Sequence, residues 1–249
     1  MATSDRDLGA PVPGLEWSAA QVLAHLAIQA ERFRDFVSGE RDPHEDLVGI
    51  DAATVPARVA AVNERLLGTV TDRDPGSLID RLRGGVTGFL EATAGVEPTT
   101  RFRSWEGTSD VAGATATLVA ELLVHGLDVG RALDVPWRVD PARAHLALPA
   151  VWALLPNYVD AVATRRVDEM VAITPRGGDA VRVRILEGSA VVAPGVRGAT
   201  CRIHGRADDL LLLAFGRVSV GSLLRRGRLV ATGRRPWVGL RVSTWFLAP

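Results

Sequence analysis

The sequence predicts an all-helical N-terminal region, residues 1–166, followed by a small α+β region, residues 167–249. In the first region apolar residues recur at helical spacing, and several segments begin with helix-capping residues. In the second region stretches such as residues 181–185 alternate apolar and polar side chains, which is typical of half-buried strands. The charge changes as well: residues 1–159 hold 14 arginines against 22 acids, and residues 160–249 hold 15 against 7. This asymmetry supports two domains, and the basic one either attracts an anionic ligand or faces the acidic one.

The composition excludes several classes of protein. The 249 residues carry no net charge, so we expect no general attraction to nucleic acid or to a membrane surface. Residues 1–15 lack the apolar core of a signal peptide, and the longest apolar stretch, residues 146–155, is too short to span a bilayer. A cytoplasmic protein is therefore expected. All 29 basic residues are arginine, which is typical of a high-GC bacterium.

The single cysteine, Cys201, excludes an intrachain disulfide. It lies in an apolar stretch that resembles a strand, so a buried and inert thiol is expected. The sequence also contains no Gly-x-Gly-x-x-Gly, no phosphate-binding loop, no Gly-x-Ser-x-Gly and no Cys-x-x-Cys. Their absence argues against nucleotide binding, serine hydrolase chemistry and a structural zinc site.

The first helix has a clear start. Ser18 is the expected N-cap and Gln21, three residues later, completes a capping box. Trp17 and Val22 fit a hydrophobic staple across this start. The helix is expected to run to about residue 37, with His25 beside its apolar face.

The remaining elements follow from caps, breakers and periodicity. Further helices are expected at residues 55–70, 76–94, 110–133 and 140–165, with Pro156 predicting a kink or break in the last. Residues 38–53 and 95–108 read as loops. In the second region we expect strands at residues 181–185, 190–192, 199–203 and 229–233, helices at 206–217 and 218–225, and a terminal helix or tail at 237–246.

The helix at residues 110–133 places polar groups on a face that should be buried. Glu121, His125 and Asp128 follow one another at steps of four and three, in one stripe with Leu118 and Ala132. Burying two carboxylates and an imidazole without partners would cost several kcal/mol. A divalent metal ion is the sharpest compensation, and an ion pair between Glu121 and His125 in a hydrated bundle core is the alternative.

A metal site needs a third ligand from another helix, and His25 is the best candidate. Three protein ligands with one open position are typical of catalytic rather than structural zinc. Asp128 either orients His125 or pairs with Arg131, and the spacing slightly favours the second arrangement. Among the other histidines, His44 is expected to be solvated. His145 and His204 are expected to be structural.

Two stretches of this sequence resemble the mycothiol-dependent maleylpyruvate isomerase family, whose members are DinB-like metal-binding helical bundles. The first is Pro13-Gly14-Leu15-Glu16-Trp17-Ser18-Ala19-Ala20-Gln21-Val22-Leu23-Ala24-His25-Leu26-Ala27, and the second runs from Glu121 to Leu133. The resemblance implies that His25, Glu121 and His125 bind a divalent metal, usually zinc. Residues 205–233 are similar to the sterol-carrier-like α+β domain of these proteins. Family members usually carry a full helix before the Trp-Ser start, so a short or missing first helix is expected here.

The resemblance also implies the chemistry and an actinobacterial origin. A small thiol such as mycothiol would bind the metal as thiolate and add to an electrophilic double bond, giving cis–trans isomerisation. Arg225 and Arg228 are the candidate catalytic groups for a substrate carboxylate, although solvated surface charge is the alternative for each. The same site would suit a mycothiol S-transferase or detoxification enzyme, and a non-catalytic ligand-binding or regulatory protein is the rival outside enzymes. A monomer or homodimer that acts on a small electrophile, with no nucleic acid or membrane partner, is expected.

Overall fold

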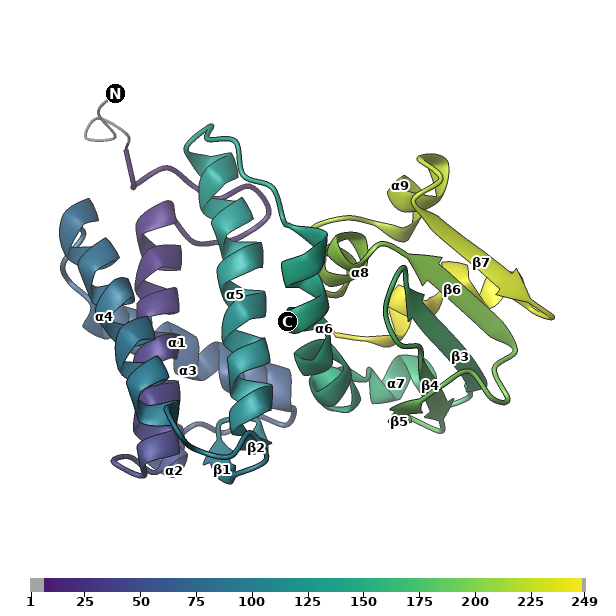
Figure 1. Cartoon of the computed structure of the whole chain (residues 1–249), viewed down its shortest axis with the longest axis horizontal. Coiled ribbons are helices and arrows are strands. Elements are labelled where there is room, and N and C mark those ends of the chain that lie inside the picture. Colours follow the sequence, from purple (N-terminus) through teal and green to yellow (C-terminus); the bar gives the residue numbers. More distant parts are fainter. Residues whose placement is uncertain (1–6, 248–249) are drawn as a thin grey trace. The chain divides into compact units, whose positions relative to one another are not determined.

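A computed structural model describes residues 7–247 of the chain (Figure 1). The chain divides into two compact units, Met1–Val139 and Asp140–Pro249. The first unit is helical apart from one small hairpin, and the second combines helices with a five-stranded sheet. The predicted fold class, a helical bundle followed by a small α+β domain, is therefore confirmed.

The first unit is built on four long helices. They are α1 (Ala19–Ser38), α3 (Val55–Thr69), α4 (Pro75–Thr93) and α5 (Val111–Ala132). A short helix, α2 (Pro43–Leu47), and a hairpin of β1 (Arg101–Ser104) and β2 (Gly107–Asp110) lie between them. The bundle thus has four long helices from α1 onward, and residues 7–18 before it form turns rather than a helix.

Helix α1 is the centre of this unit because it packs against α3, α4 and α5. The capping box at its start is present: Gln21 N donates to Ser18 Oγ at 3.3 Å, and Ser18 N donates to Gln21 Oε1 at 2.9 Å. At its other end Gly39 adopts φ 74°, a left-handed conformation that glycine accepts readily. A defined start fixes which residues of α1 face α5, and therefore where His25 points.

Apolar side chains hold α1 against its neighbours. The main cluster includes Phe33 and Phe89, whose ring centroids are 6.3 Å apart, and Phe36 and Trp105, at 5.5 Å. A second cluster, around Val12, Val22 and Leu26, packs beside the first turns of α1. Helix α5 is long and apolar enough to cross a membrane by length and composition, but half of that window is buried inside the protein. Its apolar character therefore reflects its place in the bundle core.

The second unit has a mixed sheet in the order β5-β4-β3-β6-β7, in which only β3 and β6 run parallel. Its strands are β3 (Asp168–Pro175), β4 (Val181–Leu186), β5 (Ser189–Pro194), β6 (Cys201–Gly205) and β7 (Leu229–Gly233). Its helices are α6 (Pro141–Leu154), η1 (Leu155–Tyr158), α7 (Ala161–Thr164), α8 (Ala207–Ala214), α9 (Val220–Arg225), η2 (Pro236–Leu240) and η3 (Val242–Trp245). The expected break at Pro156 is present, because α6 ends at Leu154.

The structure departs from the sequence expectations in four places. Helix α2 and the hairpin β1–β2 lie in segments expected to be loops, and β3 was not expected at all. Helix α6 packs against α8 and so belongs to the second unit, whereas the predicted limit at 166/167 assigned it to the bundle. The apolar periodicity of residues 140–165 predicts a helix, but it does not show which hydrophobic core that helix packs against. This explains why the predicted domain limit differs from the observed one.

Candidate metal centre

Two helices bring three potential ligands together. His25 comes from α1, and Glu121 and His125 come from successive turns of α5. The Nε2 atom of His25 lies 3.2 Å from Glu121 Oε2, and the Nε2 atom of His125 lies 3.1 Å from the same oxygen. The ligand atoms of the three residues all lie within 4.8 Å of one another. The sequence prediction that these three residues lie together is therefore met in the geometry.

These separations suit a tetrahedral ion. Zinc bonds of about 2.0–2.2 Å at tetrahedral angles place neighbouring ligand atoms about 3.4 Å apart. The two nitrogen–oxygen distances, 3.1 and 3.2 Å, are within a few tenths of an ångström of that value. Two imidazoles and a carboxylate leave one position of a tetrahedron open, so the residues present fit a zinc ion that also accepts an external ligand.

Asp128 fixes the orientation of His125. Its Oδ2 atom lies 2.9 Å from His125 Nδ1, and the aspartate is fully buried. An acceptor at Nδ1 holds a proton there and fixes the ring, so that Nε2 faces the centre, where loss of its proton on metal binding would leave a lone pair for the ion. Of the two arrangements that the spacing allowed for Asp128, the contact with His125 is therefore present.

Burial and hydrogen bonding oppose each other at this cluster. Burial disfavours the charged form of Glu121, but hydrogen bonds from His125 and His25 outweigh it and lower the pKa of the carboxyl. Burial also disfavours charge on His125, but Asp128 and Glu121 outweigh it and raise the pKa of this imidazole to about 9. At His25 burial dominates over Glu121, and the pKa is lowered. The cluster thus keeps one carboxylate ionised and one imidazole neutral inside the protein.

Trp17 covers one side of the cluster. Its ring centroid lies 5.0 Å from that of His25 and 6.3 Å from that of His125, and the two histidine rings are 5.1 Å apart. The sequence analysis assigned Trp17 only to a hydrophobic staple. Its position one residue before the helix cap, two turns from His25, is the signal that would have placed it at the site.

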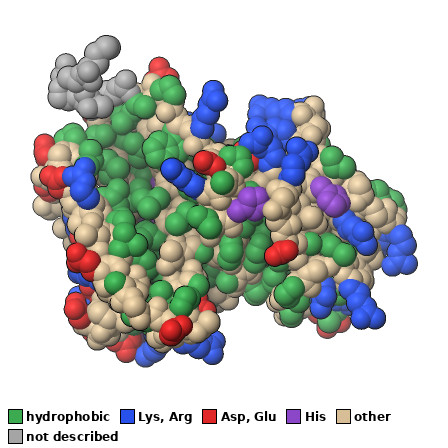
Figure 2. Space-filling model, viewed as in Figure 1, with side chains coloured by type: hydrophobic (Ala, Val, Ile, Leu, Met, Phe, Trp, Pro, Cys, Tyr) green, Lys and Arg blue, Asp and Glu red, His purple; other side chains and the backbone are tan. Residues whose placement is uncertain are grey.

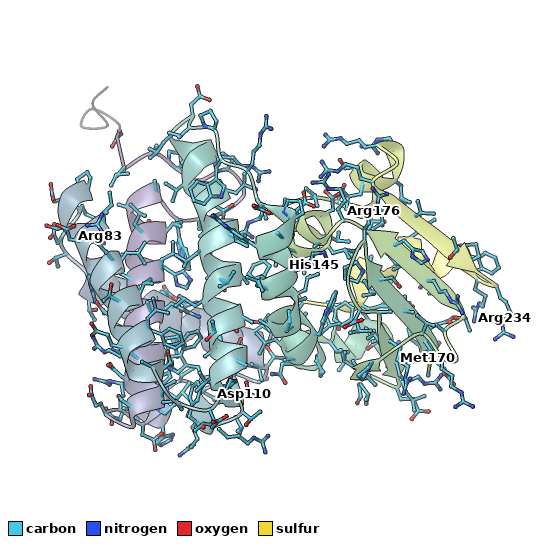
Figure 3. All side chains as sticks on the ribbon, viewed as in Figure 1. Arg83, Asp110, His145, Met170, Arg176 and Arg234 are labelled. Atoms are coloured by element: carbon cyan, nitrogen blue, oxygen red, sulfur yellow. The ribbon has the colours of Figure 1, made fainter. Side chains whose placement is uncertain are left out.

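The other three histidines lie outside this cluster. His44 is exposed on α2. His145, on α6, lies with Nε2 at 3.1 Å from the carbonyl oxygen of Arg176 (Figure 3). His204 Nε2 is 3.4 Å from Thr232 Oγ1. Among the described residues the only cluster with metal-ligand geometry is that of His25, Glu121 and His125.

Arg225 and Arg228 lie in the second unit, where basic side chains gather over α9 and the turn that follows it (Figure 2). Arg225 is exposed in the last turn of α9. Arg228 forms ion pairs with Asp209 at 2.7 Å and Asp208 at 3.3 Å, which gives its guanidinium a structural role in this unit. The role of either arginine toward a substrate stays a prediction.

The fold and the site together define a class of protein. Its members have a helical bundle with a buried His-Glu-His cluster, followed by an α+β unit. The sequence model of the mycothiol maleylpyruvate isomerase N-terminal domain matches residues 1–130, more than half of the chain. The protein therefore belongs to this family.

Two solved structures are among those that match this chain, both at low sequence identity. A crystal structure of the mycothiol-dependent maleylpyruvate isomerase is 14% identical, with a TM-score of 0.47, and the match covers 91% of this chain and 82% of that one. The UbiJ-SCP2 ubiquinone synthesis protein is 17% identical, with a TM-score of 0.33, and the match covers 40% of this chain and 92% of that one. No curated protein sequence matches the chain.

Proposed function

We propose that this protein is a zinc- and mycothiol-dependent enzyme of the maleylpyruvate isomerase type. The observation that carries the proposal is the convergence of His25, Glu121 and His125, whose ligand atoms all lie within 4.8 Å of one another, in a chain of this family. The cluster is nearly closed to solvent, since the side chains of His25, His125 and Glu121 are 6%, 8% and 14% exposed. A buried site with one open coordination position suits a small thiol better than a bulky protein ligand.

Each residue has a definite task in this proposal. Bound zinc would supply Lewis-acid chemistry that lowers the pKa of a thiol at neutral pH. Asp128 holds the tautomer of His125, and Glu121 supplies the negative charge that complements the cation. Trp17 shields the histidines on one side. The chain's own cysteine is fully buried in the sheet of the second unit, which leaves the nucleophile to an external thiol.

The proposed reaction is an addition followed by an elimination. The thiolate sulfur adds to one carbon of an activated cis double bond, which leaves a single bond about which the substrate rotates. Elimination then breaks the carbon–sulfur bond, restores the double bond in the trans form and releases the thiol unchanged. If the thiol instead remained in the product, the protein would be an S-transferase, and product analysis separates the two reactions.

Metal analysis combined with turnover tests the proposal. We expect one zinc per chain in the purified protein and mycothiol-dependent turnover of a maleyl compound. His125→Ala should lose both, because only His25 and Glu121 remain as ligands. His44→Ala is the matched control, since His44 is exposed and outside the cluster. Turnover that persists after complete removal of the metal with a chelator would contradict the proposal.

A further inference from the structure

The turn formed by η2, near the C-terminal end of the second unit, exposes two large apolar side chains. Trp237 is 56% exposed and Leu240 is 54% exposed, whereas Val238 and Gly239 between them are buried. Residues three apart in a 3-10 helix lie on the same side of it, so Trp237 and Leu240 project together. The turn therefore presents an apolar surface to solvent and buries its other side.

The backbone of this turn is packed directly on the sheet. A Cβ added to Gly239 would lie 3.0 Å from Ala231 Cβ and 3.3 Å from Cys201 Sγ, and η2 contacts both β6 and β7. At the start of the turn, Arg235 N donates to the Thr200 carbonyl at 3.0 Å. The two exposed side chains are thus held out by a segment that is itself part of the folded unit.

No internal hydrogen bond accounts for the exposure of Trp237. Trp137, which is 46% exposed, lies against α5 and donates from its indole to the Leu123 carbonyl at 3.2 Å. Among residues 7–247 no atom accepts a hydrogen bond from the Trp237 indole. An exposed tryptophan with a free indole N–H is typical of a surface that meets a partner with both apolar and polar groups.

Arginines surround these side chains, and carboxylates are scarce. Residues 210–249 hold seven arginines and no acid. Arg234 and Arg241 flank the turn, and Arg234 extends outward from the end of β7 (Figure 3). In the described part of the chain neither guanidinium has a partner, whereas Arg235 between them pairs with Glu169 at 2.6 Å. The neutral net charge, which predicted no attraction to a membrane surface, averages over this basic segment and the acidic first unit.

This combination suits an anionic lipid surface better than a protein. Tryptophan and leucine are favourable at the level of the lipid headgroups, and arginines beside them pair with lipid phosphates. The two half-exposed side chains offer roughly 200–300 Å² of apolar surface. A stable protein interface buries about 800 Å² on each partner, so the patch is small for that purpose.

We propose that the η2 turn is a membrane-docking surface, through which the second unit binds reversibly to an anionic phospholipid bilayer. Trp237 and Leu240 enter the headgroup region, and Arg234 and Arg241 contact phosphates on either side of them. The docking uses no residue of the metal centre, so it stands or falls independently of the proposed reaction.

Sedimentation of the full chain with lipid vesicles tests the electrostatic part of the proposal. We expect binding to vesicles of phosphatidylcholine mixed with phosphatidylglycerol, weaker binding in high salt, and little binding to phosphatidylcholine alone. Arg234→Ala should lower the affinity about 5-fold, the contribution of one cation near an anionic surface. Arg101→Ala is the matched control, because Arg101 is an exposed arginine on β1 of the first unit.

A second pair of variants tests the apolar part. Leu240→Ala should lower the affinity for the mixed vesicles about 3- to 10-fold, because three carbons are removed from the headgroup region. Leu90→Ala, on α4, is the matched control, since Leu90 is 58% exposed. All four substitutions are at exposed positions, so circular dichroism should show the same fold and nearly the same melting temperature for each.

No binding of the unmodified protein to the mixed vesicles would overturn the proposal. Equal effects of Leu240→Ala and Leu90→Ala, or of Arg234→Ala and Arg101→Ala, would also overturn it, because the binding would then not use this turn. Binding to polyglutamate that Leu240→Ala weakens as strongly as it weakens vesicle binding would assign the turn to an acidic protein partner instead.

Discussion

Arg228 pairs with two buried carboxylates at the start of α8, and Arg206 also pairs with one of them, Asp208, at 3.0 Å. Asp209 is 1% exposed and Asp208 is 7% exposed, and both pair with the Arg228 guanidinium. Burial raises the pKa of Asp209, although Arg228 opposes the rise. Arg228 therefore has a structural contact in the second unit, beside the catalytic and solvated roles that the sequence left open for it.

Arg228→Ala should lower the free energy of unfolding by about 2 kcal/mol, because Asp209 is left buried beside Asp208 without its cation. Arg225→Ala should change stability by less than about 0.5 kcal/mol, since Arg225 is exposed and none of the described residues pairs with it. Urea unfolding of the two variants checks the contrast. Equal stability of both would show that the pairs around Arg228 are not needed for folding.

At the residue scale the sequence could predict the ligands but not all their neighbours. Glu121 and His125 follow from helical spacing, and His25 from the start of α1 and the family resemblance. Asp128 is three residues from both His125 and Arg131, so spacing alone could not choose between them. The structure places Asp128 Oδ2 2.9 Å from His125 Nδ1, a contact that depends on the side-chain rotamers as well as on spacing.

Two glycines in long helices have opposite surroundings. Gly130, in α5, is where the chain folds back: a Cβ there would lie 2.9 Å from both the Val135 carbonyl oxygen and Trp137 Cβ. Gly84, in α4, is exposed, and a Cβ there would meet nothing within 4 Å. Only the first glycine is therefore required by packing.

Gly130→Ala should lower the free energy of unfolding by about 1–3 kcal/mol, because the backbone of residue 135 must move. Gly84→Ala should raise it by about 0.5–1 kcal/mol, since alanine is the better helix former. Chemical unfolding of both variants measures whether each substitution raises or lowers the free energy of unfolding. A higher free energy of unfolding for both variants would mean that the turn after α5 can shift to accommodate the added Cβ at little cost.

The helices that the sequence predicted best are those whose first turn is marked by an N-capping residue. Ser18 with Gln21 begins α1, and Asp110 caps α5 by accepting from Gly113 N. The hairpin β1–β2 was missed because strands of four residues show too little alternation to be distinguished from a loop. Helix α2 was missed although Asp42 caps it, because five residues carry almost no periodicity.

The two compact units differ strongly in charge. Residues 1–139 hold 13 arginines and 21 acids, and residues 140–249 hold 16 and 8. All three candidate ligands belong to the acidic unit, and its helices have a hydrophobic core of their own. The candidate site is therefore built from residues of this unit.

A fragment of residues 1–139 should fold and bind about one zinc per chain, with an affinity within a few-fold of the full chain. The ligands and Asp128 are all retained in the fragment, which is the physical reason. Helical circular dichroism and metal analysis check it, with the same fragment carrying His125→Ala as the control. A folded fragment without metal would contradict the assignment of the whole site to this unit.

The domain limit was the hardest feature to predict. The charge and pattern change near residue 166, but α6 begins at Pro141 and packs against α8. Its mixture of alanine and leucine suits either core, so local sequence cannot show which one it joins. Only contacts that are distant in sequence define the unit.

His25 and Glu121 are separated by 96 positions along the chain. Only the folded bundle brings these two side chains within reach of one ion, so an ion held by both would couple metal binding to folding. By mass action, an ion that binds only the folded bundle also favours the native state in proportion to its availability. The abundance of this protein in its cell would then follow the supply of zinc, so that metal starvation removes the enzyme as well as its chemistry.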